Sequence, residues 1–311
     1  MQTLSRRAPV GVALAALLAA CSAPPLSSPP PGNSFASARK DAGLDDLYVS
    51  DDMRGDIILL KNQGYDPDGK ITAGINGPFG VTLDDEGNLY VANRAGGNVT
   101  EYAPRVSQPS FTYSTGMTQP LSVAVDRQGD LYEGDRPIYT DSDVVNEYAQ
   151  NSNTVVHSCA VSSLYGVAVD SAGDVFVTFN SKSQGGRVEE FKGGLAGCPG
   201  IELGVHVYSA GGIALDNKAN LIIADGVGEK VVVSKPPYAK VNRSLGLHFG
   251  TPLFVSIDKA NKRVYVSDET NYWQYLYVLD YATGKKIRRL GAGHGGIAIP
   301  MAAVDGPAAQ Q

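Results

Sequence analysis

The chain has 311 residues, of which 43% are hydrophobic and 19% charged, and its formal net charge at pH 7 is −6. A mildly acidic chain lacks the basic excess that nucleic-acid binding requires, so we expect no nucleic-acid partner. The roughly 265 residues after Leu44 are enough for one large domain with a substantial core.

The N-terminal residues have the pattern of an export signal. Arg6 and Arg7 precede an apolar run from Val10 to Ala20, which is too short to span a bilayer and stops at Cys21. Leu18-Ala19-Ala20-Cys21 resembles the lipobox of bacterial lipoproteins, in which the cysteine is lipidated and the preceding residues are removed. We therefore predict a signal peptide at 1–20 and lipidation of Cys21. An ordinary secretory peptide cut near Ala20 is the alternative.

Residues 21–43 are rich in Pro, Ser and Ala and are predicted to form an extended tether rather than a core. Ser22 follows the cysteine, which favours the outer membrane in a Gram-negative cell, by resemblance to the lipoprotein sorting rule. We expect a monomer on the exported side of the cell envelope, anchored to the membrane by its lipid, with residues 44–311 as its one folded domain.

Internal repetition dominates that domain. Five apolar segments align without gaps and end in Asp, each followed by a turn and a second strand such as Leu89 to Asn93. The five segments are Gly80 to Asp84, Ser122 to Asp126, Gly166 to Asp170, Gly212 to Asp216 and Phe254 to Asp258.

A third strand follows in each repeat, and a weaker fourth strand completes it. The repeat aspartates lie 42 to 46 residues apart, which suits four short antiparallel strands per repeat. The predicted third strands are Val99 to Tyr102, Val144 to Tyr148, Val188 to Phe191, Val231 to Val233 and Tyr275 to Leu279.

The two ends of the chain supply a sixth repeat. Leu47 to Asp51 is a second strand with no first strand before it, Ile57 to Leu60 is its third strand, and Met301 to Asp305 is a first strand with no second strand after it. Pairing these ends would remove the exposed edges of an open array. The sequence therefore predicts an all-β, six-bladed β-propeller of four-stranded antiparallel blades, closed by pairing of its N- and C-terminal strands.

The segment from Pro78 to Asn93 is similar to the repeats of NHL-type propellers, related to the gluconolactonase and senescence-marker-protein group and to streptogramin lyases. The resemblance implies the fold, but this fold hosts unrelated activities. In the gluconolactonase group, the position before the motif's glycine supplies Asn and Asp ligands to a divalent metal, together with a Glu.

That position is apolar here. The residues are Phe79, Leu121, Tyr165, Gly211, Leu253 and Pro300. A hard divalent cation needs oxygen ligands, so we predict no metal and no cofactor. The alternative hypothesis is a metal-dependent, lactonase-like hydrolase or lyase at the channel mouth, and that function would require a divalent cation. Simple plugging of the channel is a second interpretation of the apolar ring.

The rim beside this ring carries polar side chains. Those that recur at the ends of second strands, Asp51, Asn93, Asp135, Asp225 and Asp268, are interpreted as turn residues. The non-recurring ones are candidates for ligand contact. Arg94 and Arg136 lie at equivalent places in neighbouring repeats, where they either clamp a carboxylate or sulfate or are two solvated surface arginines. The other non-recurring residues are Asp52, Glu269 and Asn271.

Two cysteines remain if Cys21 is lipidated. Because exported cysteines usually pair, we predict a disulfide between Cys159 and Cys198 that joins adjacent blades. No serine-histidine-acid elbow or phosphate-binding loop is visible in the sequence. We therefore expect a noncatalytic scaffold that binds an unknown protein or small molecule at the mouth of the channel, through Phe79, Leu121 and Tyr165, with Leu253 on the same ring.

Overall fold

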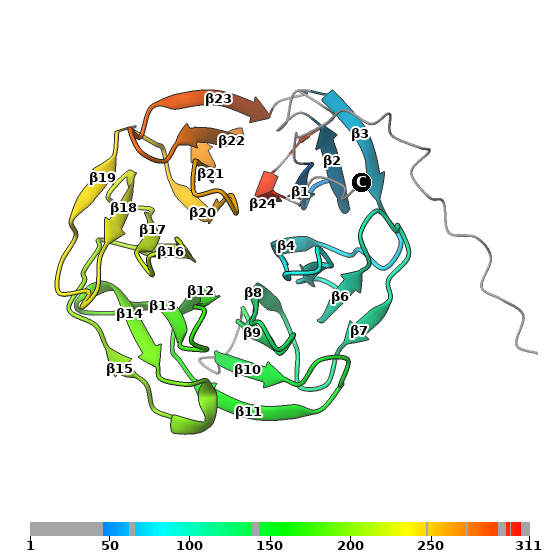
Figure 1. Cartoon of the computed structure of the whole chain (residues 1–311), viewed down its shortest axis with the longest axis horizontal. Helices are drawn as coiled ribbons and strands as arrows, with labels where there is room; N and C mark the ends of the chain where they lie inside the picture. The colour runs from blue at the N-terminus through cyan, green and yellow to red at the C-terminus, as the bar shows by residue number, and fades with distance from the viewer. Residues whose placement is uncertain are drawn as a thin grey trace, which may run out of the picture. The chain divides into compact units, whose positions relative to one another are not determined.

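Six four-stranded antiparallel sheets are arranged in a ring, with one edge strand of each sheet facing the centre (Figure 1). The predicted six-bladed β-propeller is therefore confirmed. The structure is a computed structural model, and the residues that it describes are 46–61, 66–138, 143–246, 248–270, 273–291, 297–298 and 300–305. The predicted signal peptide, Cys21 and the tether lie outside the described residues. No helix within the described residues is long and apolar enough to span a membrane.

Each blade is named here by its innermost strand. These strands are β4 (Pro78–Leu83), β8 (Pro120–Val125), β12 (Leu164–Val169), β16 (Ala210–Leu215), β20 (Pro252–Ile257) and β24 (Pro300–Asp305). The second strands are β1 (Leu47–Asp51), β5 (Leu89–Asn93), β9 (Leu131–Asp135), β13 (Val175–Ser181), β17 (Leu221–Asp225) and β21 (Arg263–Thr270).

The outer half of each blade is less regular in length. The third strands are β2 (Asp56–Lys61), β6 (Asn98–Tyr102), β10 (Val144–Tyr148), β14 (Gly185–Phe191), β18 (Lys230–Ser234) and β22 (Trp273–Asp280). The fourth strands are β3 (Asp66–Ile71), β7 (Phe111–Tyr113), β11 (Val155–Ala160), β15 (Ile201–Glu202), β19 (Arg243–Leu245) and β23 (Lys286–Gly291). A short 3-10 helix, η1 (Leu195–Gly197), lies between β14 and β15.

The ring closes where the two ends of the chain meet. Strand β24 pairs antiparallel with β1, so that Leu47 faces Asp305 and Val49 faces Ala303. This pairing confirms the predicted closure of the sixth blade by strands from both termini.

One detail of that blade differs from the sequence alignment. Asp51 pairs with Pro300, just as Asp135 pairs with Pro120 in the β8 blade. Pro300 is therefore the first residue of its strand, and Met301 takes the place in the ring that the alignment gave to Pro300. The sequence alignment matched Met301 to Ser122, whereas in the structure Ala302 takes the place of Ser122. The apolar pattern alone did not reveal this shift of one residue.

The recurring aspartate of the motif shapes the turn between the first and second strands. The Asp84 carboxylate accepts hydrogen bonds from the Asn88 backbone N–H (2.8 Å) and the Tyr90 hydroxyl (3.2 Å). Asp126 accepts the equivalent bonds from Asp130 N–H (2.9 Å) and the Tyr132 hydroxyl. The residue recurs because the hairpin needs an acceptor at this point.

The motif's glycine lies where neighbouring innermost strands approach most closely. A Cβ added to Gly80 would lie 2.8 Å from the Leu121 carbonyl oxygen and 2.9 Å from the Ser122 Cα. At Gly166, it would lie 2.9 Å from the Gly212 Cα. The small residue therefore permits the tight packing of the central strands.

The core consists of six clusters of buried apolar side chains, one between each pair of adjacent blades. Between the β4 and β8 blades, the Tyr113 and Tyr148 rings meet edge to face at 5.9 Å. The cluster at the closure joins Leu47 and Val49 to Leu276 of the β20 blade. Each blade thus depends on both of its neighbours to bury its two apolar faces.

A disulfide joins Cys159 on β11 to Cys198, which follows η1. The two Cα atoms are 5.9 Å apart. Because β11 belongs to the β8 blade and Cys198 to the β12 blade, the bond crosses between adjacent blades. The predicted pairing is confirmed.

Candidate functional site

The candidate site lies on the face of the ring formed by the loops before the innermost strands and the loops between second and third strands. We call it the arginine face, because it carries Arg94 and Arg136. The Arg94 N–H donates to the Gly77 carbonyl (2.9 Å) and the Arg136 N–H to the Gln119 carbonyl (3.1 Å). These bonds place the residue after each second strand beside the start of the innermost strand.

The ring residues lie at β-bulges, where the innermost strand has one residue that is not paired with the second strand. Register shifts fall at Leu121 in β8, at Tyr165 in β12 and at Leu253 in β20, and the same shift occurs at Met301 in β24. A bulge adds one residue to one strand, bends that strand and re-aims the extra side chain. The apolar residues predicted for the ring therefore share one local backbone geometry.

The ring residues differ in exposure and partners. Leu121 is buried, whereas Phe79, Tyr165 and Leu253 are partly exposed. The Phe79 ring meets the edge of the Phe254 ring, with centroids 6.4 Å apart. Phe79 lies on β4 and Phe254 on β20, and β24 packs between those two strands. The aromatic contact therefore bridges two blades that are not neighbours.

Both arginines stack on aromatic rings. The Arg94 guanidinium carbon lies 4.8 Å from the Phe79 ring centroid, and that of Arg136 lies 4.0 Å from the Tyr165 ring centroid. Stacking of this kind is attractive and restricts the orientation of the guanidinium plane. Arg94 stacks within its own blade, whereas Arg136 reaches across to the next one.

Arg94 lies in a mixed electrostatic environment. Burial and the neighbouring Arg136 lower the pKa of Arg94, while Asp52 acts in the opposite direction. Burial also raises the pKa of Asp52, which Arg94 lowers. Arg136 Nε forms an ion pair with the buried carboxylate of Asp143 at 3.7 Å. Arg94 Nε is buried and has no hydrogen-bond partner within the described residues.

The recurring acidic and amide residues of the rim have structural partners. Asp135 accepts a hydrogen bond from the Thr118 N–H (2.8 Å), and Asp268 accepts one from the Thr251 N–H (2.8 Å). Asn93 accepts one from the Asn76 N–H (3.1 Å). These buried side chains hold the loop that leads into the innermost strand. Asp51 and Asp225 also accept hydrogen bonds within their own turns, from the N–H groups of Arg54 (3.2 Å) and Gly228 (3.0 Å), as the sequence interpretation expected.

The remaining candidates are spread around the face. Glu269 is exposed and lies in the β20 blade, as does Leu253, away from the blades that carry the two arginines. Asn271 lies outside the described residues. Of the predicted residues, the structure therefore brings together Phe79, Arg94, Arg136 and Tyr165. Leu121 lies on β8, in the blade that also carries Arg136.

Phe254 and Asp143 contact the predicted residues but were not predicted from the sequence to lie at the site. Phe254 stands where four of the five aligned segments have Gly or Ser, so its departure from the pattern was a visible signal. Asp143 precedes a third strand at the end of a loop with no repeat pattern. Its approach to Arg136 depends on the path of that loop, which no spacing rule predicts.

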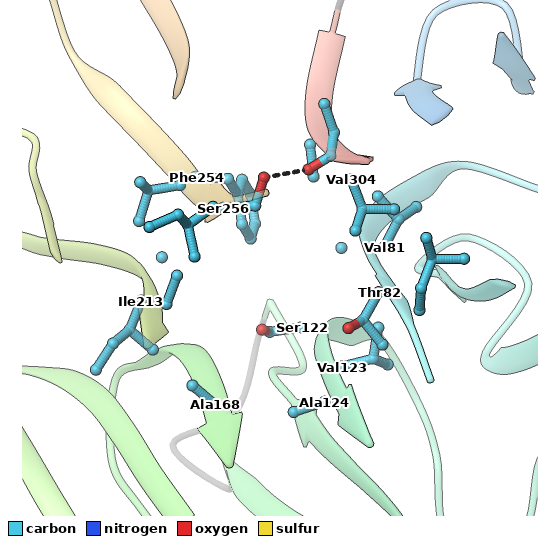
Figure 2. Close-up of a pocket in the computed structure, with 18 of the residues that line it drawn as sticks. Val81, Thr82, Ser122, Val123, Ala124, Ala168, Ile213, Phe254, Ser256 and Val304 are labelled. Atoms are coloured by element: carbon cyan, nitrogen blue, oxygen red, sulfur yellow. Dashed lines mark hydrogen bonds between the residues drawn. The ribbon is translucent and has the colours of Figure 1, made fainter. Parts of the chain in front are cut away.

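A separate cavity of about 310 Å³ occupies the centre of the ring. Figure 2 shows side chains of the innermost strands around it, including Val81, Val123, Ala168 and Ile213. The lining extends to Lys259 and to other residues at the far ends of these strands, and it includes none of the four predicted ring residues. The cavity thus runs along the channel from the residues that follow the ring position, such as Gly80 and Ser122, to the end opposite the arginine face.

Within the part of the chain that the structure describes, no three His, Cys, Asp or Glu side chains gather so that they could hold a metal ion. The ring position offers one oxygen-bearing side chain, the Tyr165 phenol. This donor set is poor for a hard divalent cation.

No protein-family model matches the sequence, and no curated protein matches it. Solved structures do. A chain of the nidogen/laminin complex has a TM-score of 0.64 at 16% identity, covering 85% of this chain and 99% of that one. A protein of unknown function from Bacteroides caccae has a TM-score of 0.66 at 9% identity, with the same coverage. A functionally unknown protein from Desulfotomaculum acetoxidans gives 0.57 at 14%, covering 83% and 82%.

At these identities the likeness concerns the fold alone. It supports the six-bladed β-propeller that the pairing of the strands defines.

Proposed function

We propose that this protein is a binding or scaffold module that holds a protein partner on its arginine face. The observation that carries the proposal is the distribution of exposed apolar side chains. Four of them lie in loops of that face: Met53, Ile138, Tyr208 and Val227, which are 69%, 57%, 70% and 71% exposed. These residues lie in several blades around the ring, and their shared location on one face favours that face as an interaction surface.

The opposite face differs. In the described loops there, the one large hydrophobic residue counted as exposed is Val106, at 39%. An exposed ion pair between Lys259 and Asp85 (3.3 Å) marks that end of the ring instead. Arginine and aromatic residues are enriched in the energetically important parts of protein interfaces, which also favours the arginine face.

A similar fold occurs in a chain of the nidogen/laminin complex, so a propeller of this shape is part of a protein assembly there. For the present chain we propose the finer points that the sequence favours. They are export, lipidation at Cys21 and location in the cell envelope, at the outer membrane if the cell has one. They also include a monomeric state and kinship with NHL-type propellers.

The proposal is tested by partner capture with the full chain from a membrane extract of its own cells. Phe79→Asp places a carboxylate under Arg94, and Tyr165→Ala removes the ring beneath Arg136, so both variants should lose a partner that the wild type holds. Lys259→Ala, on the opposite face, should hold it normally. Melting curves should show that all three variants are folded. A partner retained by both Phe79→Asp and Tyr165→Ala would place the binding surface elsewhere.

We further propose that binding needs no metal ion. The melting temperature of the full chain should be the same in EDTA and in millimolar calcium, magnesium, manganese or zinc. A cation held with a dissociation constant of about 1 μM would stabilise the fold by roughly 4 kcal/mol at millimolar concentration. A clear upward shift with one cation would contradict the proposal and favour the metal-dependent hydrolase or lyase instead.

A further inference from the structure

Two of the stacked arginines, Arg243 and Arg94, differ in how they are bonded to the fold. Arg243 stacks over Tyr281 at 4.6 Å, and its Nη2 and Nη1 groups donate to the carbonyls of Tyr281 (2.7 Å) and Ala282 (3.2 Å). Arg94 stacks over Phe79 in the same way, but its buried Nε lacks an acceptor within the described residues. The guanidinium of Arg243 is thus hydrogen-bonded to the backbone, whereas Arg94 has an N–H donor that no acceptor within the described residues satisfies.

Each of the two arginines has one carboxylate beside it. Arg136 lies close enough to disfavour the charge of Arg94, although the chain as a whole is acidic. Asp143 is ion-paired with Arg136. Asp52, the carboxylate that acts on Arg94, is exposed to solvent. Two guanidinium groups are therefore held by aromatic stacking, and the carboxylate that acts on Arg94 is open to screening by solvent.

An anion bound by both groups would give the Arg94 guanidinium a further acceptor and would offset the repulsion that Arg136 exerts on Arg94. A guanidinium presents up to five N–H donors in a planar fork, and carboxylate, sulfate and phosphate oxygens accept them in short, charge-assisted bonds. The rings beneath the arginines fix the two forks before the anion arrives, so less conformational entropy is lost on binding.

We propose that Arg94 and Arg136 together bind one oxyanion group of the ligand, so that the partner presents an acidic group at this point. The inference rests on the proposed function for the location of the face, and it adds the chemistry of the ligand. The flanking exposed side chains of Met53 and Ile138 would meet apolar residues next to that group.

The test uses free anions, so that it does not depend on a captured partner. In the full chain labelled with ¹⁵N-arginine, the Nε–Hε signals are followed during titration with acetate or sulfate, against chloride at constant ionic strength. The signals of Arg94 and Arg136 should shift along one saturation curve, while that of Arg243 stays within its chloride baseline. A stronger response to acetate assigns a carboxylate partner, and a stronger response to sulfate assigns a sulfate or phosphate group.

Variants show whether the two arginines act as one site. In Arg136→Gln, the response of Arg94 should weaken at least tenfold, and Arg94→Gln should weaken that of Arg136 equally. The matched control, Arg243→Gln, should leave both responses intact, and melting curves should show that each variant is folded. The inference is overturned if Arg94 and Arg136 respond no more than Arg243, or if Arg136→Gln leaves Arg94 unchanged. Either result would leave the partner-capture test of the face standing.

Discussion

Glu133 on β9 is the residue at which one blade departs most from the others. It is fully buried, and at the same position the other second strands have Val or Ile. Asn146 Nδ2 donates to Glu133 Oε2 at 3.0 Å, while Oε1 has no hydrogen-bond partner in the described part of the chain. Burial raises the pKa of Glu133 well above its usual value, and the Asp135 charge raises it further. The aliphatic residues at the same position are Val49, Val91, Val177, Ile223 and Val266.

The raised pKa makes the stability of the fold depend on pH. Folded Glu133 holds its proton more tightly than the unfolded chain does, so its contribution is fully present below the unfolded pKa, near 4.3, and is lost as the pH rises through the folded pKa. Glu133→Gln keeps the shape without the charge. We expect this variant to be more stable than the wild type by about 1 to 3 kcal/mol at pH 8, with little difference at pH 4.

Urea unfolding of the two proteins between pH 4 and pH 8 checks this prediction, because every other titrating group is common to both. Glu133→Val, which restores the residue type of the other blades, should show the same loss of pH dependence. Parallel stability curves for wild type and Glu133→Gln would contradict the raised pKa.

The residue scale also shows where sequence reasoning succeeded. Positions that recur, such as Asp84 and Gly80, were predictable because one local geometry is imposed in several blades. Single departures such as Glu133 and Phe254 are visible in the sequence, but their consequences depend on packing across blades. The stacking of Arg136 on Tyr165 was not predictable, because it joins two blades through side-chain geometry rather than strand register.

At the scale of elements, the disulfide ties the outer edges of two blades together. Cys159 and Cys198 are 39 residues apart, and constraint of the unfolded chain by such a loop corresponds to about 4 kcal/mol in the chain-entropy model. We expect Cys159→Ala with Cys198→Ala to lower the free energy of unfolding by about this amount. Urea unfolding without reductant measures the difference.

A control separates the bond from the packing around it. Cys159 is buried in the cluster between the β8 and β12 blades. The wild-type chain, reduced and alkylated at Cys198 alone, should therefore lose nearly as much stability as the double variant. A double variant as stable as the oxidised wild type would show that the bond adds nothing.

The elements were predictable to different degrees. The first three strands of each blade carry apolar residues into the clusters between blades, which produces a clear pattern in the sequence. Strand β15 (Ile201–Glu202) has two exposed residues and therefore leaves no such pattern. The register of β24 was missed by one residue, since its run of small apolar residues fits the motif in two ways.

At the scale of the whole molecule, stability requires that the ring be closed. Six clusters lie between six pairs of blades, so each blade is buried on both sides only if β24 completes the last one. Its residue Ala303 is 4% exposed and packs in the cluster that joins the β24 and β20 blades. The sequence predicted this closure because each terminus carries the strands that the other lacks.

Removal of all residues after Ala298 should therefore affect the whole ring rather than one edge. It takes away β24, leaves β1 without its inner neighbour and opens two inter-blade clusters to water. We expect the melting temperature to fall by roughly 10 °C or more, with increased binding of a hydrophobic dye. A synthetic peptide of residues 299–311, added in excess, should restore much of the loss by pairing with β1. The same peptide with Ala303→Glu should not restore it, because a carboxylate at that position would be buried without a partner. A truncated chain that melts like the wild type would mean that five blades and a partial sixth are stable without closure.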